Sequence, residues 1–486
     1  MSAGSFVLCY NFNGILYVVL SHVLEVYMNN RITISIVKIL NPLLVTGVFF
    51  LIWRFYYSLG TVVTYWWRGE IVIVGIFFVL YTFLAHFYNG FWVHINRANE
   101  LIYSQLVSLI ITSVILYFLM LLLWKQFPSV IPIVVAVLIQ TAIIIIWTNL
   151  SIRWYRKTHN RKKTVLIWDE RTGLDGLLEE KDKDVYFDIV GTYSVDQYFA
   201  EPKKILEMAE IVFLCDVHSH DRNQILKECL TRGKTAYVIP RIGDTIMMGS
   251  VNTHLLHLPI LFINNESASI EYLITKRMFD IVVSIIGLIV LSPIMLITSI
   301  LIKLYDKGTV FYRQKRLTKN GKVFEIIKFR SMKMDAEKTG QAILASSNDD
   351  RITPIGKVIR TCRIDELPQL INIIKGDMSI IGPRPERPEI VEQYSEELPE
   401  FSLRLRMRAG LTGYAQVYGK YNTTPYDKLL MDLIYISKAS IAEDIKIMLA
   451  TIKILFVPES TEGVDSLQTT AMKKTDKDGV DERVEG

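Results

Sequence analysis

Four long apolar stretches dominate the first third of the chain. Each approaches the roughly 20 residues that a helix needs to cross a bilayer. They cover residues 34–57, 71–88, 101–124 and 130–150. A weaker stretch at residues 6–27 is interrupted by polar side chains such as Asn11 and Glu25, so we interpret it as an interfacial segment or a poor span. The pattern predicts an N-terminal membrane domain with about four transmembrane helices over residues 1–155.

Basic residues follow the fourth stretch and indicate its orientation. The flank contains Arg153, Arg156, Lys157, Arg161, Lys162 and Lys163. Cytoplasmic flanks of membrane helices carry such an excess of lysine and arginine. We therefore expect the fourth helix to end in the cytoplasm and the chain to stay there as far as residue 275. With four spans the N-terminus is cytoplasmic as well, whereas a crossing by residues 6–27 would place it outside.

Residues 160–265 have the rhythm of a small α/β domain. Short apolar runs alternate there with helix-like segments, which predicts a parallel sheet. The runs cover residues 164–168, 189–192, 211–215, 236–239 and 260–263. The turn after the first run, residues 169–174, lacks the GxGxxG fingerprint of a dinucleotide site. A regulatory or assembly role is therefore favoured over nucleotide binding.

A fifth strongly apolar stretch, residues 276–303, differs from the first four. Ser292-Pro293 lies in its middle, where a proline removes a helix hydrogen bond and bends the helix. Lysine and arginine flank both of its ends, which conflicts with the preference of positive charge for the cytoplasmic side. A re-entrant helix, which breaks at Ser292 and Pro293 and returns to the cytoplasmic side, satisfies both features. An ordinary span with a kink remains the alternative.

The rest of the chain reads as a water-soluble region with a polar tail. Residues 441–456 alternate apolar and charged positions at helical spacing, which predicts a helix on the surface of a domain or bilayer. We expect disorder over the charged residues 459–486. Hydrophobic residues make up 51% of the chain, as in a protein that is part membrane. The net charge of +5 is too small to suggest nucleic acid, and the four cysteines form no CxxC or zinc pattern.

The candidate chemistry begins with an acidic pair, Asp365 and Glu366, which is followed by Leu-Pro-Gln. A carboxylate can act as a covalent nucleophile toward phosphorus. Its neighbour can bind Mg²⁺ or move a proton. Because an isolated Asp-Glu pair is usually a solvated surface pair, the interpretation depends on the surrounding sequence.

Cationic groups surround this acidic pair along the chain. Arg360 precedes it, Lys328-Phe329-Arg330 lies further upstream, and Gly382-Pro383-Arg384-Pro385 follows it. The two prolines limit the backbone freedom of Arg384. A guanidinium held in this way suits bidentate binding of phosphate oxygens. Lys328, Arg330, Arg360 and Arg384 are therefore the candidate phosphate-binding residues.

Together these motifs resemble those of the bacterial sugar transferase family, the monotopic phosphoglycosyl transferases. Residues 275–458 carry the resemblance to the catalytic domain, and the whole chain is similar to the long form of the family. That form implies a membrane helical bundle, a cytoplasmic Rossmann-like α/β domain at residues 160–265, and a mixed α/β catalytic domain at residues 276–458 with a re-entrant membrane helix. Thr361-Cys362-Arg363-Ile364 and Arg408-Ala409-Gly410 depart from the usual family residues. Both departures bear on substrate choice more than on reaction type.

The resemblance also implies a reaction and its partners. Asp365 matches the family nucleophile, which takes a phosphosugar from a UDP-sugar and releases UMP. Glu366 matches the acid that supports Mg²⁺ and the second step, in which polyprenyl (undecaprenyl) phosphate accepts the phosphosugar. The implied location is the cytoplasmic face of the bacterial inner membrane, at the first membrane step of capsular or exopolysaccharide synthesis. Glucose and galactose are the favoured sugars, and the choice between them and the formation of a homo-oligomer stay open.

Two alternatives from other classes of protein explain less of the chain. A non-enzymatic membrane sensor or regulatory protein of the same pathway explains residues 1–265 but leaves the motifs after residue 276 without a purpose. A redox membrane protein would use the α/β domain, and the missing GxGxxG fingerprint counts against it.

Overall fold

The computed structural model describes most of the chain. It covers residues 35, 37–58, 67–93, 96–124, 127–169, 187–263, 268–333, 351–419 and 424–455. These residues divide into two compact units, Met1–Val238 and Ile239–Gly486, and each unit is described by itself. The weak stretch at residues 6–27 and the tail at 459–486 lie outside the described residues.

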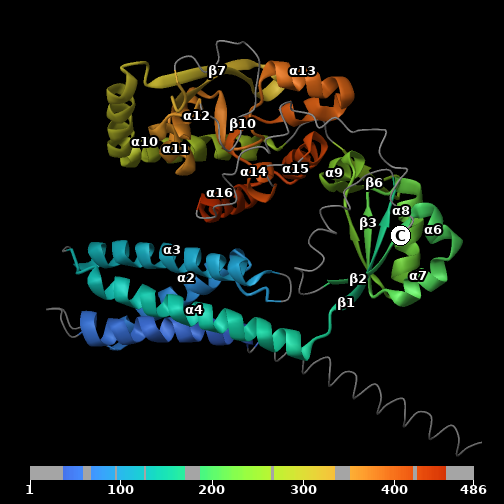
Figure 1. The fold of residues 1–486 in the computed structure, drawn as a ribbon, viewed down its shortest axis with the longest axis horizontal. Helices are drawn as coiled ribbons and strands as arrows, with labels where there is room; N and C mark the ends of the chain where they lie inside the picture. The colour runs from blue at the N-terminus through green and yellow to red at the C-terminus, as the bar shows by residue number, and fades with distance from the viewer. Residues whose placement is uncertain are drawn as a thin grey trace, which may run out of the picture. The chain divides into compact units, whose positions relative to one another are not determined.

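The first unit contains the four predicted long apolar helices (Figure 1). They are Val37–Tyr57, which ends in the π-helix η1 (Trp53–Ser58), α2 (Trp67–Phe87), α3 (Ala98–Trp124) and α4 (Ile131–Thr158). All four are long and apolar enough to cross a membrane. Large apolar side chains such as Leu122 and Ile131 are exposed on their surfaces, as expected for contact with lipid. The prediction of four apolar helices is confirmed.

Polar side chains join these helices inside the bundle. Asn41 donates to Gln105 (2.9 Å) and accepts from the Tyr81 hydroxyl (2.9 Å). Gln105 in turn donates to the carbonyl of Gly90 at 2.7 Å. All three side chains are fully buried. Because hydrocarbon offers no partners to polar groups, these bonds fix how the helices pack.

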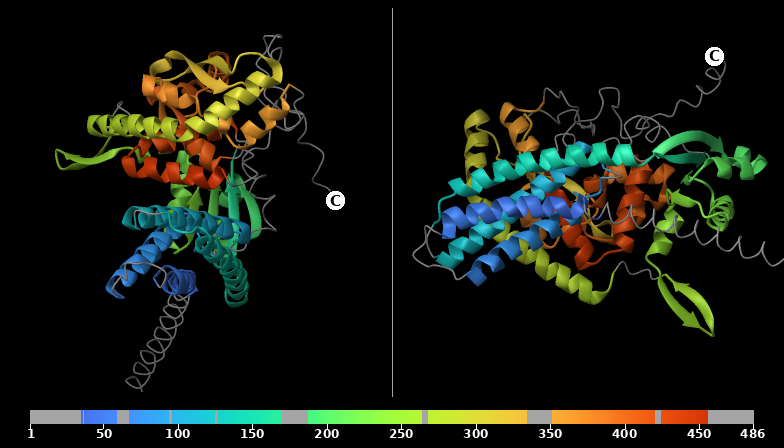
Figure 2. Two further views of the ribbon diagram at one scale, coloured as in Figure 1. Left: turned by 90° about the vertical axis from the view of Figure 1, so that its left-hand side faces the viewer. Right: turned by 90° about the horizontal axis from the view of Figure 1, so that it is seen from below.

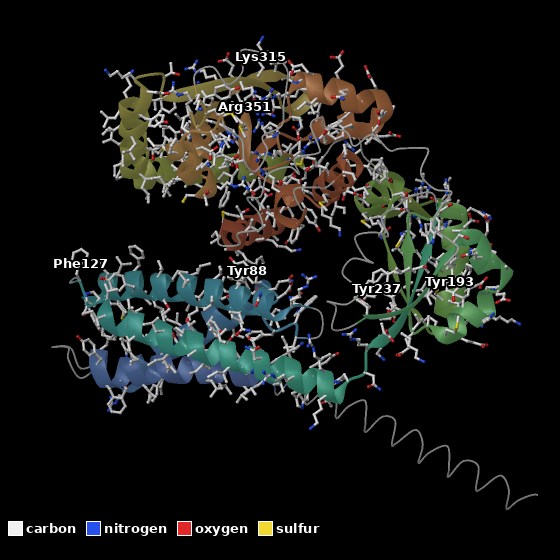
Figure 3. All side chains as sticks on the ribbon, in the orientation of Figure 1. Tyr88, Phe127, Tyr193, Tyr237, Lys315 and Arg351 are labelled. Carbon is white, nitrogen blue, oxygen red and sulfur yellow. The ribbon has the colours of Figure 1, made fainter. Side chains whose placement is uncertain are left out.

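The same unit holds a four-stranded parallel sheet in the order β2-β1-β3-β4. Its strands are β1 (Lys162–Trp168), β2 (Phe187–Ser194), β3 (Ile211–Cys215) and β4 (Thr235–Val238), with helices α6 (Val195–Ala200), α7 (Pro202–Met208) and α8 (Ser219–Thr231). Tyr193 and Tyr237, labelled in Figure 3, mark the two outer strands. Val165, Ile167, Val212 and Leu214 are buried because the central strands are covered on both faces. Four of the five predicted strands are thus confirmed in one parallel sheet.

The fifth predicted run does not join that sheet, so this part of the prediction is wrong. It forms β6 (Leu258–Phe262), which pairs antiparallel with β5 (Val251–Leu255) in the second unit. Leu256 and His257 connect the strands with φ angles of 51° and 63°. Two successive residues with positive φ make the tight turn that suits a twisted hairpin. Both strands are exposed throughout.

The helix α10 (Ile270–Asp306) contains the fifth apolar stretch and has Pro293 inside it. Its helical structure is continuous, and Figure 2 shows that its axis changes direction along its length. The Ser292 hydroxyl donates to the carbonyl of Ile289 (2.7 Å), close to where the proline removes a backbone donor. Only 11% of the residues in its most apolar 18-residue stretch are buried, against 33% in the corresponding stretch of each of the other four long helices. The helix thus presents a largely uncovered apolar surface.

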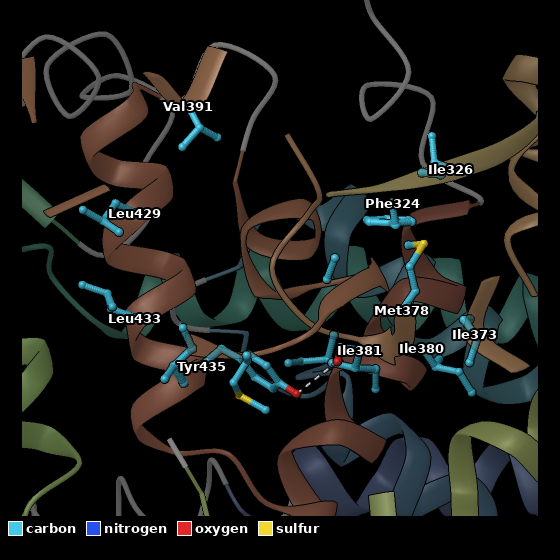
Figure 4. Packing of buried hydrophobic residues seen from close by; sticks show 14 of the residues in the cluster. Phe324, Ile326, Ile373, Met378, Ile380, Ile381, Val391, Leu429, Leu433 and Tyr435 are labelled. Carbon is cyan, nitrogen blue, oxygen red and sulfur yellow. Dashed lines mark hydrogen bonds between the residues drawn. The ribbon is translucent and has the colours of Figure 1, made fainter. Parts of the chain in front are cut away.

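Most of the remaining elements of the second unit pack around one hydrophobic core (Figure 4), while Ile302, Phe329 and Ile359 form a smaller buried cluster. Phe324, Ile373, Met378, Leu429 and Leu433 are among the buried members of the larger core. The elements are α9 (Ile242–Met248), β7 (Phe311–Leu317), η2 (Lys319–Gly321), β8 (Val323–Phe329), α11 (Pro354–Thr361), η3 (Ile364–Glu366), α12 (Gln369–Lys375), β9 (Met378–Ile381), α13 (Pro388–Glu397), η4 (Pro399–Arg406), β10 (Ala409–Thr412), α14 (Tyr414–Tyr418), α15 (Pro425–Ser437) and α16 (Ile441–Leu455). β7 and β8 form an antiparallel pair, and β9 and β10 a parallel pair.

Candidate active site

A tight reversal of the chain presents the acidic pair. Helix α11 ends at Thr361, and Arg363 then adopts a left-handed backbone conformation with φ of 55°. The short 3₁₀ helix η3 follows at once and carries Asp365 and Glu366. The backbone amide of Glu366 donates to the carbonyl of Arg363 (3.3 Å), which closes the turn. Asp365 is only 9% exposed, so the pair is not a solvated surface pair.

Three cations converge on the carboxylate of Glu366. Lys328 Nζ lies 3.2 Å and Arg384 Nη2 lies 3.1 Å from the same oxygen, Oε1. Arg363 Nη1 lies 3.8 Å from the other oxygen, Oε2. The Glu366 side chain is 12% exposed, so these charges interact in a poorly solvated setting where attraction is strong. The sequence separations of 38 and 18 residues show that the fold, and not local helix geometry, brings Lys328 and Arg384 together.

The surroundings shift the pKa values of the two carboxyl groups in opposite directions. Burial and the negative charge of Glu366 raise the pKa of Asp365 above its ordinary value. Burial would also raise the pKa of Glu366, but Lys328, Arg384 and Arg363 outweigh it and hold that pKa well below its usual range. A carboxylate with a higher pKa is the more basic of the two and so the stronger electron-pair donor. The electrostatics therefore separate a basic carboxylate, Asp365, from one that holds cations, Glu366.

Asn372 of α12 fixes the strand that carries Lys328. Its side-chain oxygen accepts from the amide of Ile327 (3.0 Å), and its side-chain nitrogen donates to the carbonyl of Glu325 (2.8 Å). These two bonds join α12 to β8 beside the lysine. Burial lowers the pKa of Lys328, although the charge of Glu366 opposes that shift. The position of Lys328 is thus set by the rigid elements on either side of it.

The loop that carries Arg384 lies tightly against β10. The amide of Gly382 donates to the carbonyl of Thr412, and the amide of Gly410 donates to the carbonyl of Pro383, each at 2.9 Å. A Cβ on Gly382 would come within 2.3 Å of the carbonyl oxygen of Arg408, and one on Gly410 within 2.2 Å of the amide nitrogen of Gly382. Both positions therefore require glycine, because any side chain would push the two segments apart.

A buried ionic network supports the same loop from behind. Arg404 pairs with Asp432 (2.7 Å), and both side chains are at most 2% exposed. Arg404 also donates to the backbone carbonyl of Arg384 at 2.9 Å. Glu386 accepts from Lys428 and lies 3.7 Å from both Arg404 and Arg316. Although its burial favours the neutral acid, these cations lower the pKa of Glu386 to about 2, which keeps the network charged.

The structure brings together some of the predicted site residues and separates others. Lys328 and Arg384 meet at Glu366, next to Asp365. Arg360 donates to the Ser331 hydroxyl (2.8 Å), and its positive charge offsets part of the rise in the pKa of Asp365. Arg330 instead forms an ion pair with Asp306.

Arg363 is a site residue that the sequence reasoning overlooked. It precedes the acidic pair closely, so its proximity to Glu366 along the chain was a usable signal. The network of Glu386, Arg404 and Asp432 gave no such signal, because its members come from three separate segments.

The oxygen donors available to a metal are few. Among the residues that the structure describes, no group of three or more His, Cys, Asp or Glu side chains could hold a metal ion. A site made only of protein ligands is therefore not formed in that part of the chain. Mg²⁺ commonly binds one or two carboxylates and completes its shell with water and substrate phosphates. Asp365 and Glu366 could supply the one or two carboxylates of such a Mg²⁺ site.

The fold and the site together define the class of protein. It is a membrane protein whose second unit holds a buried acidic pair beside cations that suit phosphate binding. Residues 271–458 match the family described as bacterial sugar transferase. The chain is 38% identical over 199 residues to the exopolysaccharide production protein PSS of Rhizobium leguminosarum bv. phaseoli, a match that covers 39% of this chain and 98% of that protein. This chain therefore belongs to the bacterial sugar transferase family.

Two longer relatives share a smaller part of their length with this chain. The UDP-N-acetylgalactosamine-undecaprenyl-phosphate N-acetylgalactosaminephosphotransferase of Aeromonas hydrophila is 39% identical over 237 residues, which are 47% of this chain and 54% of that protein. The UDP-glucose:undecaprenyl-phosphate glucose-1-phosphate transferase of Klebsiella pneumoniae is 31% identical over 293 residues, 57% of this chain and 62% of that protein. The chain thus matches a little more than half the length of these two relatives.

Proposed function

We propose that this enzyme transfers a sugar-1-phosphate from a UDP-sugar to undecaprenyl phosphate and so begins the synthesis of a capsular or extracellular polysaccharide. The observation that carries the proposal is the meeting of Lys328 and Arg384 at Glu366, beside the buried and more basic Asp365. Such a site can hold a diphosphate and offer one carboxylate as a nucleophile. Family membership and the names of the relatives support the same reaction.

The proposed chemistry has two balanced steps. In the first, an oxygen of the Asp365 carboxylate bonds to the phosphorus that bears the sugar, and the bond from that phosphorus to the UMP oxygen breaks. In the second, a phosphate oxygen of undecaprenyl phosphate bonds to the same phosphorus, and Asp365 leaves as a carboxylate. Lys328 and Arg384 bind and orient the phosphate oxygens in both steps, because cations placed before the reaction stabilise charge without reorganisation. Bound at Asp365 and Glu366 with the substrate phosphates, Mg²⁺ would supply further charge neutralisation.

The identity of the released nucleotide tests the reaction type. Full-length protein in lipid should release UMP from a UDP-sugar when undecaprenyl phosphate is present, whereas a simple glycosyl transfer would release UDP. A panel with glucose, galactose and N-acetylgalactosamine as the sugar covers our favoured sugars and those named for the two longer relatives. A folded protein that releases neither nucleotide with any member of the panel would favour the alternative of a non-enzymatic membrane regulator.

We further propose that α10 is a re-entrant helix that keeps the catalytic unit at the cytoplasmic face. The support is its uncovered apolar surface, its change of direction, and the basic residues at both ends, among them Lys276 and Lys303. The basic flank after α4 supports a cytoplasmic position for the residues that follow it. An ordinary span would carry residues 307–455 to the other side of the membrane.

Cysteine labelling should distinguish the two topologies. Glu271→Cys and Lys322→Cys place thiols at exposed positions in the first turn of α10 and after its end, in a background without the native cysteines, of which Cys362 is exposed. Both thiols should react with a membrane-impermeant reagent only after the cytoplasmic side is opened, since a re-entrant helix returns the chain to its starting side. Labelling of residue 322 alone from outside intact cells would contradict the re-entrant arrangement.

Arg384→Lys should lower turnover by about tenfold, which corresponds to roughly 1.4 kcal/mol of barrier. Lysine keeps the positive charge, but it loses the planar fork that binds two phosphate oxygens at once. Steady-state UMP release in lipid measures the effect. Arg313→Lys is the matched control, because Arg313 lies on β7 with a 66% exposed side chain and, within the described residues, pairs with Glu325 alone. Wild-type turnover by Arg384→Lys would show that charge alone is needed there.

A further inference from the structure

A cavity with a largely apolar lining and several cationic side chains lies along the first half of α10. It has a volume of about 370 Å³, which is large enough for a ligand head group. Arg277, Lys319 and Arg408 line it, from α10, from η2 and from the segment before β10. The acidic pair and Lys328 do not line it, so it is distinct from the candidate active site.

The charges in this cavity are not balanced by protein carboxylates. Arg277 donates to the carbonyls of Ile373 (2.6 Å) and Ile374 (2.8 Å), which orient the guanidinium without neutralising it. Within the described ranges, neither Lys319 nor Arg408 forms an ion pair or a side-chain hydrogen bond, and Arg277 has no carboxylate partner. The cavity thus carries unpaired positive charge from three separate elements.

The two other ionisable groups of α10 in this cavity are already engaged. Lys276 forms a buried ion pair with Asp444 at 2.8 Å. Asp280 is 1% exposed, and its Oδ1 accepts from the amide of Ile380 at 3.0 Å. The lining therefore holds one buried carboxylate and, besides Arg406, three cations without carboxylate partners in the described residues. An anionic ligand would complete the charge balance of the cavity.

An apolar stripe leads away from the same cavity. Ile270, Ile274 and Met278 line it and are 66%, 58% and 65% exposed. Their spacing of four residues makes them neighbours along α10, and Val282 and Ile286 continue the stripe, which winds slowly around the helix. A stripe of this kind suits a hydrocarbon chain, and the cations at its start suit an acidic head group.

We propose that this cavity binds the phosphate head group of an anionic membrane lipid, whose chain lies along the apolar stripe of α10. The occupant is an acidic glycerophospholipid of the bilayer, because the cavity is distinct from the candidate active site. A polyprenyl phosphate shares the same chemistry and is the rival outcome of the test. Arg277, Lys319 and Arg408 supply the positive charge, and Ile274 and Met278 contact the chain. The site does not take part in the covalent step, so its occupancy is measurable without any turnover.

Native mass spectrometry of the full chain released from lipid nanodiscs tests this site. The wild-type protein should retain phosphatidylglycerol in preference to phosphatidylcholine. The double variant Lys319→Gln/Arg408→Gln should retain at least about fivefold less phosphatidylglycerol, because it removes two of the three cations that attract the head group. The double variant Lys322→Gln/Arg313→Gln is the control, since it removes the same charge from exposed positions outside the cavity. Equal thermal transitions of the proteins show that the variants fold.

The remaining arms identify the lipid and can overturn the proposal. Displacement of phosphatidylglycerol by polyprenyl phosphate would make the polyprenyl lipid the occupant, and failure to displace it would make the glycerophospholipid the occupant. Lys319→Arg/Arg408→Lys should restore retention, because it keeps both charges. Unchanged retention by the Gln variant, equal retention of phosphatidylcholine, or displacement of the lipid by inorganic phosphate at matched concentration would each refute a site for an anionic lipid.

Discussion

Asp365→Asn should abolish the covalent phosphosugar adduct and lower turnover by roughly a thousandfold or more, because an amide cannot serve as the attacking carboxylate. Wild-type protein incubated with UDP-sugar and Mg²⁺, without undecaprenyl phosphate, should release one round of UMP and carry the phosphosugar on Asp365. Peptide mass spectrometry locates the adduct. The variant should give neither UMP nor adduct under the same conditions.

The same substitution should leave the fold intact or slightly more stable. Burial and the charge of Glu366 raise the pKa of Asp365, so folding strengthens proton binding at this residue. At a pH above both the folded and the unfolded pKa, the ionised Asp365 therefore costs folding free energy, and a neutral amide removes that cost. Thermal unfolding should show a midpoint equal to or above that of the wild type. A loss of turnover with unchanged or raised stability separates chemistry from misfolding.

Asp377→Asn is a matched control for this experiment. Asp377 follows α12 in the same unit, and within the described residues its side chain makes no ion pair or hydrogen bond; its backbone carbonyl accepts from Thr318. Turnover should stay at the wild-type level. The competing mechanism, direct attack by undecaprenyl phosphate in a ternary complex, predicts no UMP before lipid is added. Full turnover by Asp365→Asn would end the covalent proposal.

The arrangement of apolar and polar positions was sufficient to predict much of the fold. The four N-terminal helices and the strands at Thr164, Ile189, Ile211 and Ala236 follow from local hydrophobic runs, because burial in lipid or in a sheet requires such runs. The run at residues 260–263 was assigned to the wrong sheet. An apolar run of that length does not encode its partner, and the pairing was decided by the tight turn at Leu256 and His257.

The residues of the candidate site could be predicted from the sequence, but the contacts among them could not. The sequence named Asp365, Glu366, Lys328 and Arg384, yet spacing alone could not show that both cations share one oxygen of Glu366. Such long-range contacts depend on the packing of α12 against β8. They also depend on the close approach of the Arg384 loop to β10, which Gly382 and Gly410 allow. For the same reason the sequence could not predict the ion pair between Arg330 and Asp306.

Asp432→Asn should reduce both stability and turnover, through different routes. Arg404 and Asp432 form two close contacts, at 2.7 and 2.9 Å, in a region that is almost fully buried. Removal of one charge leaves the guanidinium largely uncompensated, at a cost of about 3 kcal/mol of unfolding free energy. Denaturant unfolding of the purified protein measures this loss.

Turnover of the same variant should fall by about a hundredfold, because Arg404 holds the carbonyl of Arg384 and a displacement of about 1 Å at a substrate-binding group has an effect of that size. Adding Arg404→Met to Asp432→Asn removes the uncompensated charge, so stability should partly recover while turnover stays low. Asp427→Asn, on the same helix α15, should change both quantities little. Recovery of turnover together with stability would reduce the network to a structural role, whereas persistent loss of turnover would establish that it positions Arg384 for phosphate binding.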